Sequence, residues 1–474
     1  MKFLCLGDIH LGRTPSRLPA GLGDPRPAQA IGPAAAFRRC VDYALDHDIR
    51  ALLLAGDVID DKDDFYEACG ELRRGIERLA KAKVPIVAVN GNHDGQTLPR
   101  LFDALALESG STDPDACGFY LLGRGGKWEA LTIEDESGAA VHLLGWSFPS
   151  VRVRTSPLDS LLPPKLRPPG LEDRRGPVIG LLHCDRDAPA SPWAPVRSRD
   201  LAAAPVDAWL LGHIHKADAL TPPRPMGYLG SLTGLDPGET GPHGPWLLEC
   251  KRLSLDIEHL PLAPLRWEEL TIDLEGIEDY EEVQARIVAA VSRRHRAILA
   301  GHPSPSEGVR RARHDDPEAG CPPPLAVGCR LRFTGRISGR GAIERRLEAE
   351  NPIERFDIEQ EGIRYFVHDW RLETRPPIDL ELLAQGSDPP ALLARRLLAL
   401  RSDGANPQDE ALRKTLIDGY RRRLASRSSG PFLKFGHSPP DDETVVGLLQ
   451  EAAFSALDAL QAQREGQDEE GRGS

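Results

Sequence analysis

The stretch KVPIVAVNGNHD, residues 83–94, decides the fold. Its run of isoleucine, valine and alanine predicts a β-strand, because β-branched side chains favour the extended backbone and no polar residue interrupts the run. A glycine then ends the strand, and three polar side chains follow at once: Asn92, His93 and Asp94. What this cluster can do depends on what the other strands of the same sheet carry at their ends.

Other strands of the same kind alternate with helices. The predicted strands at 2–8 and 49–57 have apolar centres, FLCL and ALLLA, and amphipathic helical patterns lie between and after them at 34–48 and 67–82. Strands without a polar face predict a sheet that is covered on both sides. Further short strands follow closely between residues 140 and 250, which indicates a second sheet packed on the first. The fold class expected is α/β (α+β).

The length of 474 residues favours two or three domains. We expect the first domain at 1–262 and a small α+β domain at 265–375, with a Pro/Gly-rich insertion near 301–324. A helical region at 376–462 follows, and the acidic tail at 463–474 has the composition of a disordered segment.

The bulk composition narrows the class of protein. The first strand is too short for a signal peptide, and no apolar run approaches the ~18 residues of a membrane span, so we expect a cytoplasmic protein without a membrane segment. None of the eight cysteines forms a two-residue-spaced pair, which favours reduced structural thiols. The net charge of −13 argues against a general nucleic-acid binder, although arginine clusters such as 421–423 leave room for a local basic surface.

Candidate metal ligands stand at the ends of five predicted strands. In an open α/β sheet the carboxyl ends of the strands are where ligands bind. A mixture of carboxylate, imidazole and amide groups suits two divalent ions such as Mn²⁺, Fe²⁺ or Zn²⁺ better than an oxygen-only Ca²⁺ site. Each motif alone is more often a turn or helix cap, but five in succession favour a metal site. The ligands are Asp8, His10, Asp57, Asn92, His183, His213 and His215.

The series GDIH…AGD…GNHD…LLH…GHIH is similar to the five-motif signature of calcineurin-like metallophosphoesterases. The resemblance implies two mixed sheets flanked by helices, and a pair of metal ions bridged by Asp57. It implies that His93 lies near the leaving group as a proton donor or charge stabiliser, with Asp94 holding its other ring nitrogen; the alternative is that His93 is only a hydrogen-bond partner behind the site. The implied ligand sets are Asp8, His10, Asp57 and His215 for one ion, and Asp57, Asn92, His183 and His213 for the other.

Three longer segments resemble the SbcD-type DNA repair exonucleases, including their YhaO-like branch: residues 1–13, 181–216 and 227–244. This resemblance implies a DNA exonuclease with possible endonuclease activity that uses two Mn²⁺ ions. It also implies a homodimer, a capping domain at 265–375, and docking of an SbcC-like coiled-coil ATPase on the helices that follow.

Some positions stay open. Asp60 stands where archaeal and eukaryotic nucleases have a catalytic histidine, and it is either a polar group behind the site or a loop residue. Arg13, Arg186 and Arg197 are candidate phosphate contacts, although isolated arginines are more often solvated surface charges.

Two other functions were weighed against the nuclease. A stand-alone phosphoesterase for nucleotides or cyclic nucleotides is favoured by the net charge, but the ~200 residues beyond the first domain count against it. A non-catalytic adaptor has no support, because every ligand position is filled.

Overall fold

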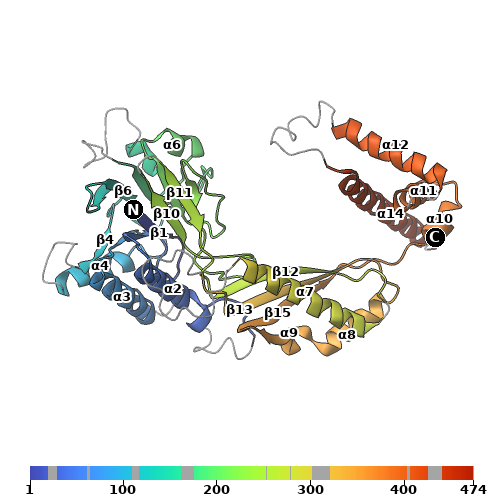
Figure 1. The fold of residues 1–474 in the computed structure, drawn as a ribbon, viewed down its shortest axis with the longest axis horizontal. Coiled ribbons are helices and arrows are strands. Elements are labelled where there is room, and N and C mark those ends of the chain that lie inside the picture. Colours follow the sequence, from blue (N-terminus) through green and yellow to red (C-terminus); the bar gives the residue numbers. More distant parts are fainter. Residues whose placement is uncertain are drawn as a thin grey trace. The chain divides into compact units, whose positions relative to one another are not determined.

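A computed structural model describes residues 1–19, 29–60, 65–108, 117–161, 176–251, 254–277, 279–301, 321–402, 406–424 and 440–472. The chain forms two compact units (Figure 1). The first contains residues 1–335 and 339–374, and the second contains residues 336–338 and 375–474. The two domains that the sequence separates near residue 264 therefore make one unit by their contacts.

The first sheet has six strands in the order β11-β10-β1-β2-β3-β4. Strands β1 to β4 run parallel, and β10 joins β1 in the antiparallel sense. All five residues of the ALLLA strand are buried, as expected for a strand covered on both faces. The bounds are β1 (Lys2–Leu6), β2 (Ala51–Ala55), β3 (Ile86–Val89), β4 (Phe119–Leu121), β10 (Trp246–Cys250) and β11 (Leu255–His259).

The second sheet, expected from the closely spaced strands, has the order β5-β6-β7-β8-β9. Strands β6 to β9 are parallel, and β5 is antiparallel at one edge. The bounds are β5 (Glu129–Glu134), β6 (Ala140–Trp146), β7 (Val178–His183), β8 (Ala208–Gly212) and β9 (Met226–Tyr228).

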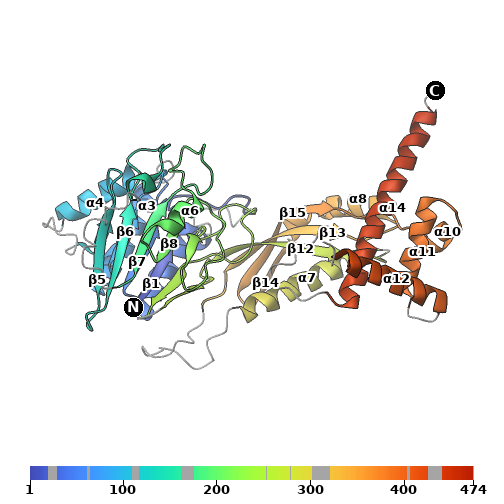
Figure 2. The same ribbon diagram turned by 90° about the horizontal axis from the view of Figure 1, so that it is seen from above.

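The two sheets pack face to face between layers of helices. Leu53 of β2 and Leu181 of β7 belong to the core between the sheets, while Leu52 and Leu54 point to the other face of the first sheet. That outer face is covered by α2 (Pro33–Asp46), α3 (Phe65–Lys81) and α4 (Thr97–Glu108), and α6 (Ser198–Ala203) packs on the second sheet (Figures 1 and 2). The structure thus confirms the predicted fold class.

A third sheet, the capping sheet, has the order β12-β13-β15-β14. Trp267, near the start of β12, is fully buried and packs against Phe366 of β15. Most of the predicted insertion at 301–324 lies outside the described residues. The bounds are β12 (Leu265–Asp273), β13 (Ala326–Thr334), β14 (Asp357–Gln360) and β15 (Ile363–Leu372), with α7 (Tyr280–Ala300), α8 (Arg340–Glu350) and α9 (Pro352–Arg355).

The second unit is helical, with α10 (Leu380–Ala384), α11 (Pro389–Arg401), α12 (Pro407–Leu424) and α14 (Asp442–Arg472). Helix α14 continues to Arg472, into the segment 463–474 whose composition predicts a disordered tail. The segment contains no proline, and its Gln, Glu and Arg residues are good helix formers, whereas Gly466 and Gly471 are poor ones. Among the described residues, no helix is both long and apolar enough to cross a bilayer.

Candidate metal centre

The five motifs lie at the carboxyl ends of β1, β2, β3, β7 and β8, with His183 the last residue of β7, and their side chains meet there. Four of the residues have a backbone that L-residues rarely adopt: φ is 41° at Asp8, 51° at His10, 50° at Asp57 and 107° at His213. Each such residue costs on the order of 1–3 kcal/mol, and such conformations cluster at functional sites. The chain therefore leaves each strand abruptly and turns the polar side chains toward one point.

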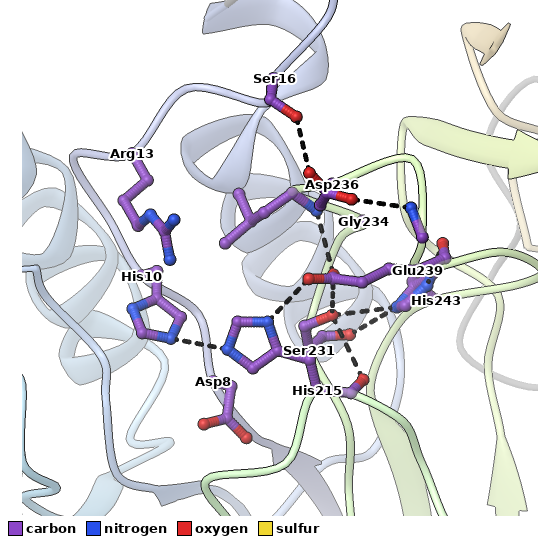
Figure 3. Close-up of polar contacts among 12 residues, drawn as sticks. Asp8, His10, Arg13, Ser16, His215, Ser231, Gly234, Asp236, Glu239 and His243 are labelled. Atoms are coloured by element: carbon purple, nitrogen blue, oxygen red, sulfur yellow. Dashed lines mark hydrogen bonds and ion pairs between the residues drawn. The ribbon is translucent and has the colours of Figure 1, made fainter. Parts of the chain in front are cut away.

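One group of ligand atoms combines Asp8, His10 and His215 within 4.8 Å of one another. The Nε2 atoms of His10 and His215 lie 3.1 Å apart (Figure 3). The Asp8 carboxylate also accepts hydrogen bonds of 2.9 and 3.1 Å from the backbone N–H of His213, which ties the first motif to the last.

A second group combines Asp8, Asp57 and His183, and Asn92 adjoins it. His183 Nε2 lies 3.3 Å from Asp57 Oδ2 and 3.1 Å from Asn92 Oδ1. Its Nδ1 lies 3.1 Å from the carbonyl oxygen of Ala55, so the Nδ1–H donates there and leaves Nε2 facing the site. Asp57 Oδ2 is also 3.9 Å from His10 Nε2. Asp57 therefore lies between the two groups, the place that a bridging ligand takes.

His213 stands at the edge of the site. Its ring centroid is 5.3 Å from that of His183 and 5.3 Å from that of Trp193, and its Nε2 lies 4.0 Å from Asp185 Oδ2. The structure thus brings six of the seven predicted ligands into close contact and places the seventh beside them.

The surroundings of Gly91 explain why the motif GNHD, residues 91–94, begins with glycine. A Cβ atom at this position would lie 2.2 Å from Asp57 Oδ1, far inside van der Waals contact. The same Asp57 oxygen accepts a 2.9 Å hydrogen bond from the backbone N–H of His93. The bare backbone at Gly91 therefore leaves space for the carboxylate between the two groups.

The role predicted for Asp94 is wrong. Its carboxylate accepts hydrogen bonds of 2.7 Å from the backbone N–H groups of Gly91 and Val58, so it fastens the turn itself. The residue beside His93 is Asp60, whose Oδ2 lies 3.4 Å from His93 Nδ1. Asp94 follows His93 in sequence, but the turn directs the two side chains apart. Asp60 is buried, and together with His10 and His93 it forms a third group of candidate ligand atoms within 4.8 Å of one another.

The charges of the buried groups fit a cationic occupant. Burial raises the pKa of Asp8. Burial also acts to raise the pKa of Asp57, but His183, His10 and His93 together hold it below its usual range. Burial also disfavours a charged His183, but Asp57 raises the pKa of His183 to about 9. No lysine or arginine of the described segments forms an ion pair with Asp8 or Asp57. Buried carboxylates without such a partner, facing imidazole nitrogens, suit divalent ions.

The three candidate arginines differ in their surroundings. Arg13 Nε lies 3.8 Å from Asp60 Oδ2, and its side chain is 39% exposed. Arg186 is engaged elsewhere, in an ion pair of 2.9 Å with Asp218. Arg197 is exposed at the start of α6. Of the three, Arg13 is therefore the one that adjoins the site with a free face.

Sequence reasoning missed the partner of His215. Its Nδ1 lies 2.8 Å from Glu239 Oε1, and Glu239 comes from the glycine-rich turn after β9 (Figure 3). The only available signal was the presence of a carboxylate in GETGPHG, which the sequence marked for its turn and not for this contact.

The part of the chain that carries the five motifs is similar to known proteins. Residues 1–217, which include all five motifs, match the family described as calcineurin-like phosphoesterase. The uncharacterized metallophosphoesterase YhaO of Bacillus subtilis (strain 168) is 24% identical over 252 residues, or 51% of this chain. The match spans about half of that relative, 55% of its length.

Two solved structures resemble part of the chain. The protein TT1561 of Thermus thermophilus has 13% identity and a TM-score of 0.32, over 54% of this chain and 98% of that one. A dimetal phosphatase from Danio rerio has 14% identity and a TM-score of 0.31, over 55% and 98%.

Proposed function

We propose that the two-sheet domain, whose residues 1–217 match the calcineurin-like phosphoesterase family, hydrolyses DNA phosphodiester bonds as the nuclease subunit of a complex with an SbcC-like ATPase. The observation that carries the hydrolytic part is the meeting of five strand ends in two ligand groups that share Asp8, with Asp57 Oδ2 3.3 Å from His183 Nε2 and 3.9 Å from His10 Nε2. Asp8, His10, Asp57 and His215 would hold one metal ion, and Asp57, Asn92, His183 and His213 the other.

Two metal ions, Mn²⁺ in this proposal, would supply charge neutralisation on the phosphate and activation of a water molecule. Proton donation and phosphate binding fall to side chains of the protein. His93 is 38% exposed and therefore accessible to substrate, with Asp60 behind its Nδ1 at 3.4 Å. In this arrangement Nε2 of His93 gives a proton to the leaving oxygen, while Asp60 stabilises the charged ring. Arg13 binds a neighbouring phosphate.

The choice of DNA is supported by the SbcD-like segments at 1–13, 181–216 and 227–244. It is also supported by the capping sheet and the helical unit, which follow the phosphoesterase domain in the chain. The capping sheet and the helical unit at 375–474 are more chain than a small hydrolase needs. The helices offer a docking site for the ATPase, which would add DNA affinity that an acidic subunit lacks. A homodimer is part of the same proposal.

A second candidate is hydrolysis of nucleotides or cyclic nucleotides by the chain alone. The net charge of −13 favours it, because a small anionic substrate needs little basic surface.

The test compares linear duplex DNA with cyclic nucleotides, metal by metal, with and without the partner ATPase. We expect Mn²⁺-dependent DNA digestion, and His93→Gln should lower its rate by about 10²–10⁴-fold while metal content stays at two ions. His47→Gln, which replaces a histidine at the end of α2, is the control and should keep the parent rate. Hydrolysis of a cyclic nucleotide without DNA digestion would refute the nuclease and favour the second candidate.

A further inference from the structure

Glu239 fixes the orientation of His215. The Nδ1–H of His215 donates to Glu239 Oε1 at 2.8 Å, which leaves Nε2 free to face His10 and Asp8. Metal-binding histidines commonly carry such a carboxylate on the second ring nitrogen, because it sets both the tautomer and the ring plane. Only 18% of the Glu239 side chain is exposed, so water competes little for this contact.

The second oxygen of Glu239 is fixed as well. Oε2 accepts hydrogen bonds of 2.9 Å from Ser231 Oγ and 3.1 Å from the backbone N–H of Leu235. Ser231 in turn donates its own N–H to the carbonyl oxygen of His215 at 2.9 Å. We call residues 231–241 the Glu239 loop (Figure 3). The loop therefore contacts both the ring of His215 and its backbone carbonyl oxygen.

The capping sheet holds the Glu239 loop at both sides of Glu239. Trp267 Nε1–H donates to the carbonyl oxygen of Gly234 at 3.0 Å, and Gly241 N–H donates to the carbonyl oxygen of Trp267 at 2.8 Å. The fit is tight, because a Cβ atom at Gly234 would lie 2.6 Å from Trp267 Cδ1. Trp267 is itself fully buried, so it offers the loop a fixed support.

A third anchor joins the Glu239 loop to the segment that carries His10. Ser16 N–H donates to the carbonyl oxygen of Leu235 at 2.9 Å, and Ser16 Oγ donates to Asp236 Oδ2 at 3.1 Å. The position of Glu239 therefore depends on contacts from the capping sheet and from the loop after β1, in addition to its own turn.

We propose that the Glu239 loop is a positioning device through which Trp267 of the capping sheet sets the metal affinity of the site that contains His215. Glu239 is the positioning residue, and Trp267 acts through it. The inference rests on the proposed metal site but not on DNA as the substrate.

The test is calorimetric titration of metal-stripped full-length protein with Mn²⁺. Glu239→Ala should weaken one of the two binding events by about 10–100-fold and leave the other near the parent value. Glu239→Gln should lose less, because its amide oxygen still accepts from Nδ1–H. Glu268→Gln is the control: it removes a buried carboxylate of β12 whose ion pairs are with Arg266 and Arg294 and not with a residue of the Glu239 loop.

The role of Trp267 is tested by Trp267→Phe, which keeps a buried ring but removes the donor to Gly234. The control is Trp128→Phe, which removes a comparable indole hydrogen bond to Pro157 at 3.0 Å. Trp267→Phe should weaken the same binding event as Glu239→Ala, and Trp128→Phe should not. The double variant Glu239→Ala/Trp267→Phe should be no weaker than Glu239→Ala, since the tryptophan acts through the carboxylate.

Co²⁺ in place of Mn²⁺ adds a readout of ligand geometry, because its visible absorption should change in Glu239→Ala and Trp267→Phe but not in the controls. Two parent-like affinities in Glu239→Ala would overturn the positioning role. Additive losses in the double variant, or a Trp267→Phe titration like that of Trp128→Phe, would overturn the coupling to the capping sheet. Shifted metal affinities in a protein that cuts no DNA would refute the nuclease and leave this inference standing.

Discussion

His368 should make the capping sheet sensitive to acid. The residue is buried in β15, with its ring centroid 5.1 Å from that of Trp267, and neither ring nitrogen has a hydrogen-bond partner within the described structure. Burial lowers the pKa of His368 from 6.5 to about 4, and the nearby Arg330 and Arg17 act in the same direction against the opposing charges of Asp369 and Asp236. The folded protein therefore keeps this ring neutral where the unfolded chain would protonate it.

The direction in which stability changes with pH follows from the protons bound by the folded and unfolded states. Between pH 6.5 and pH 4 the unfolded state holds more protons than the folded state, so stability falls as the pH falls through this window. At pH 5 the chain lies 1.5 pH units below the unfolded value of 6.5 and above the folded value of about 4. At 1.36 kcal/mol per unit, His368 costs about 2 kcal/mol of unfolding free energy relative to pH 7.5.

The assay is urea unfolding of the full-length chain at pH 7.5 and pH 5.0, for the parent and His368→Phe. Phenylalanine keeps an aromatic ring against Trp267 and removes the titrating group, so the two proteins should have similar unfolding free energies at pH 7.5. At pH 5.0 the variant should be the more stable by about 2 kcal/mol. Equal losses in both proteins would refute the reasoning, and so would a larger loss in the variant.

Two further predictions concern the site itself. Gly91→Ala should lower the affinity for Mn²⁺ by at least about 10-fold, because the added Cβ meets Asp57 Oδ1 at 2.2 Å. The control in the same calorimetric titration is Gly419→Ala, since Gly419 in α12 has open space around it. Parent-like affinity in Gly91→Ala would contradict the geometry. Asp60→Asn should lower the turnover of phosphodiester substrate by about 10–100-fold while both metal ions still bind, since it removes the charge behind His93; a loss of metal affinity with unchanged turnover would show that Asp60 serves the ligands instead.

The sequence predicted those parts of the structure that depend on local pattern. The strand that ends at Val89 is apolar on both faces and could only be a covered strand, and Asn92 follows it at the carboxyl end where ligands gather. The same reasoning applied to β1, β2, β7 and β8, so the position of the ligands followed from the order of the strands.

What the sequence could not predict depends on pairing across the fold. Asp60 reaches His93 because β2 and β3 lie side by side in parallel, although the two residues are 33 positions apart. Glu239 reaches His215 through a long turn that contacts a different sheet. The predicted contact between Asp94 and the His93 ring is not formed, because in this tight turn backbone N–H groups bind the carboxylate instead. Side chains that are neighbours in sequence need not be neighbours in such a turn.

The strained backbone at Asp8, His10, Asp57 and His213 has a consequence for protein engineering. A glycine at His10 or His213 would adopt the same positive φ without strain, so substitutions to glycine should accumulate at these two positions among variants selected for heat resistance alone. Each would discard a side chain of the proposed metal centre. A library screened for thermostability without a second screen for metal uptake would therefore be enriched in folded proteins that have lost their chemistry.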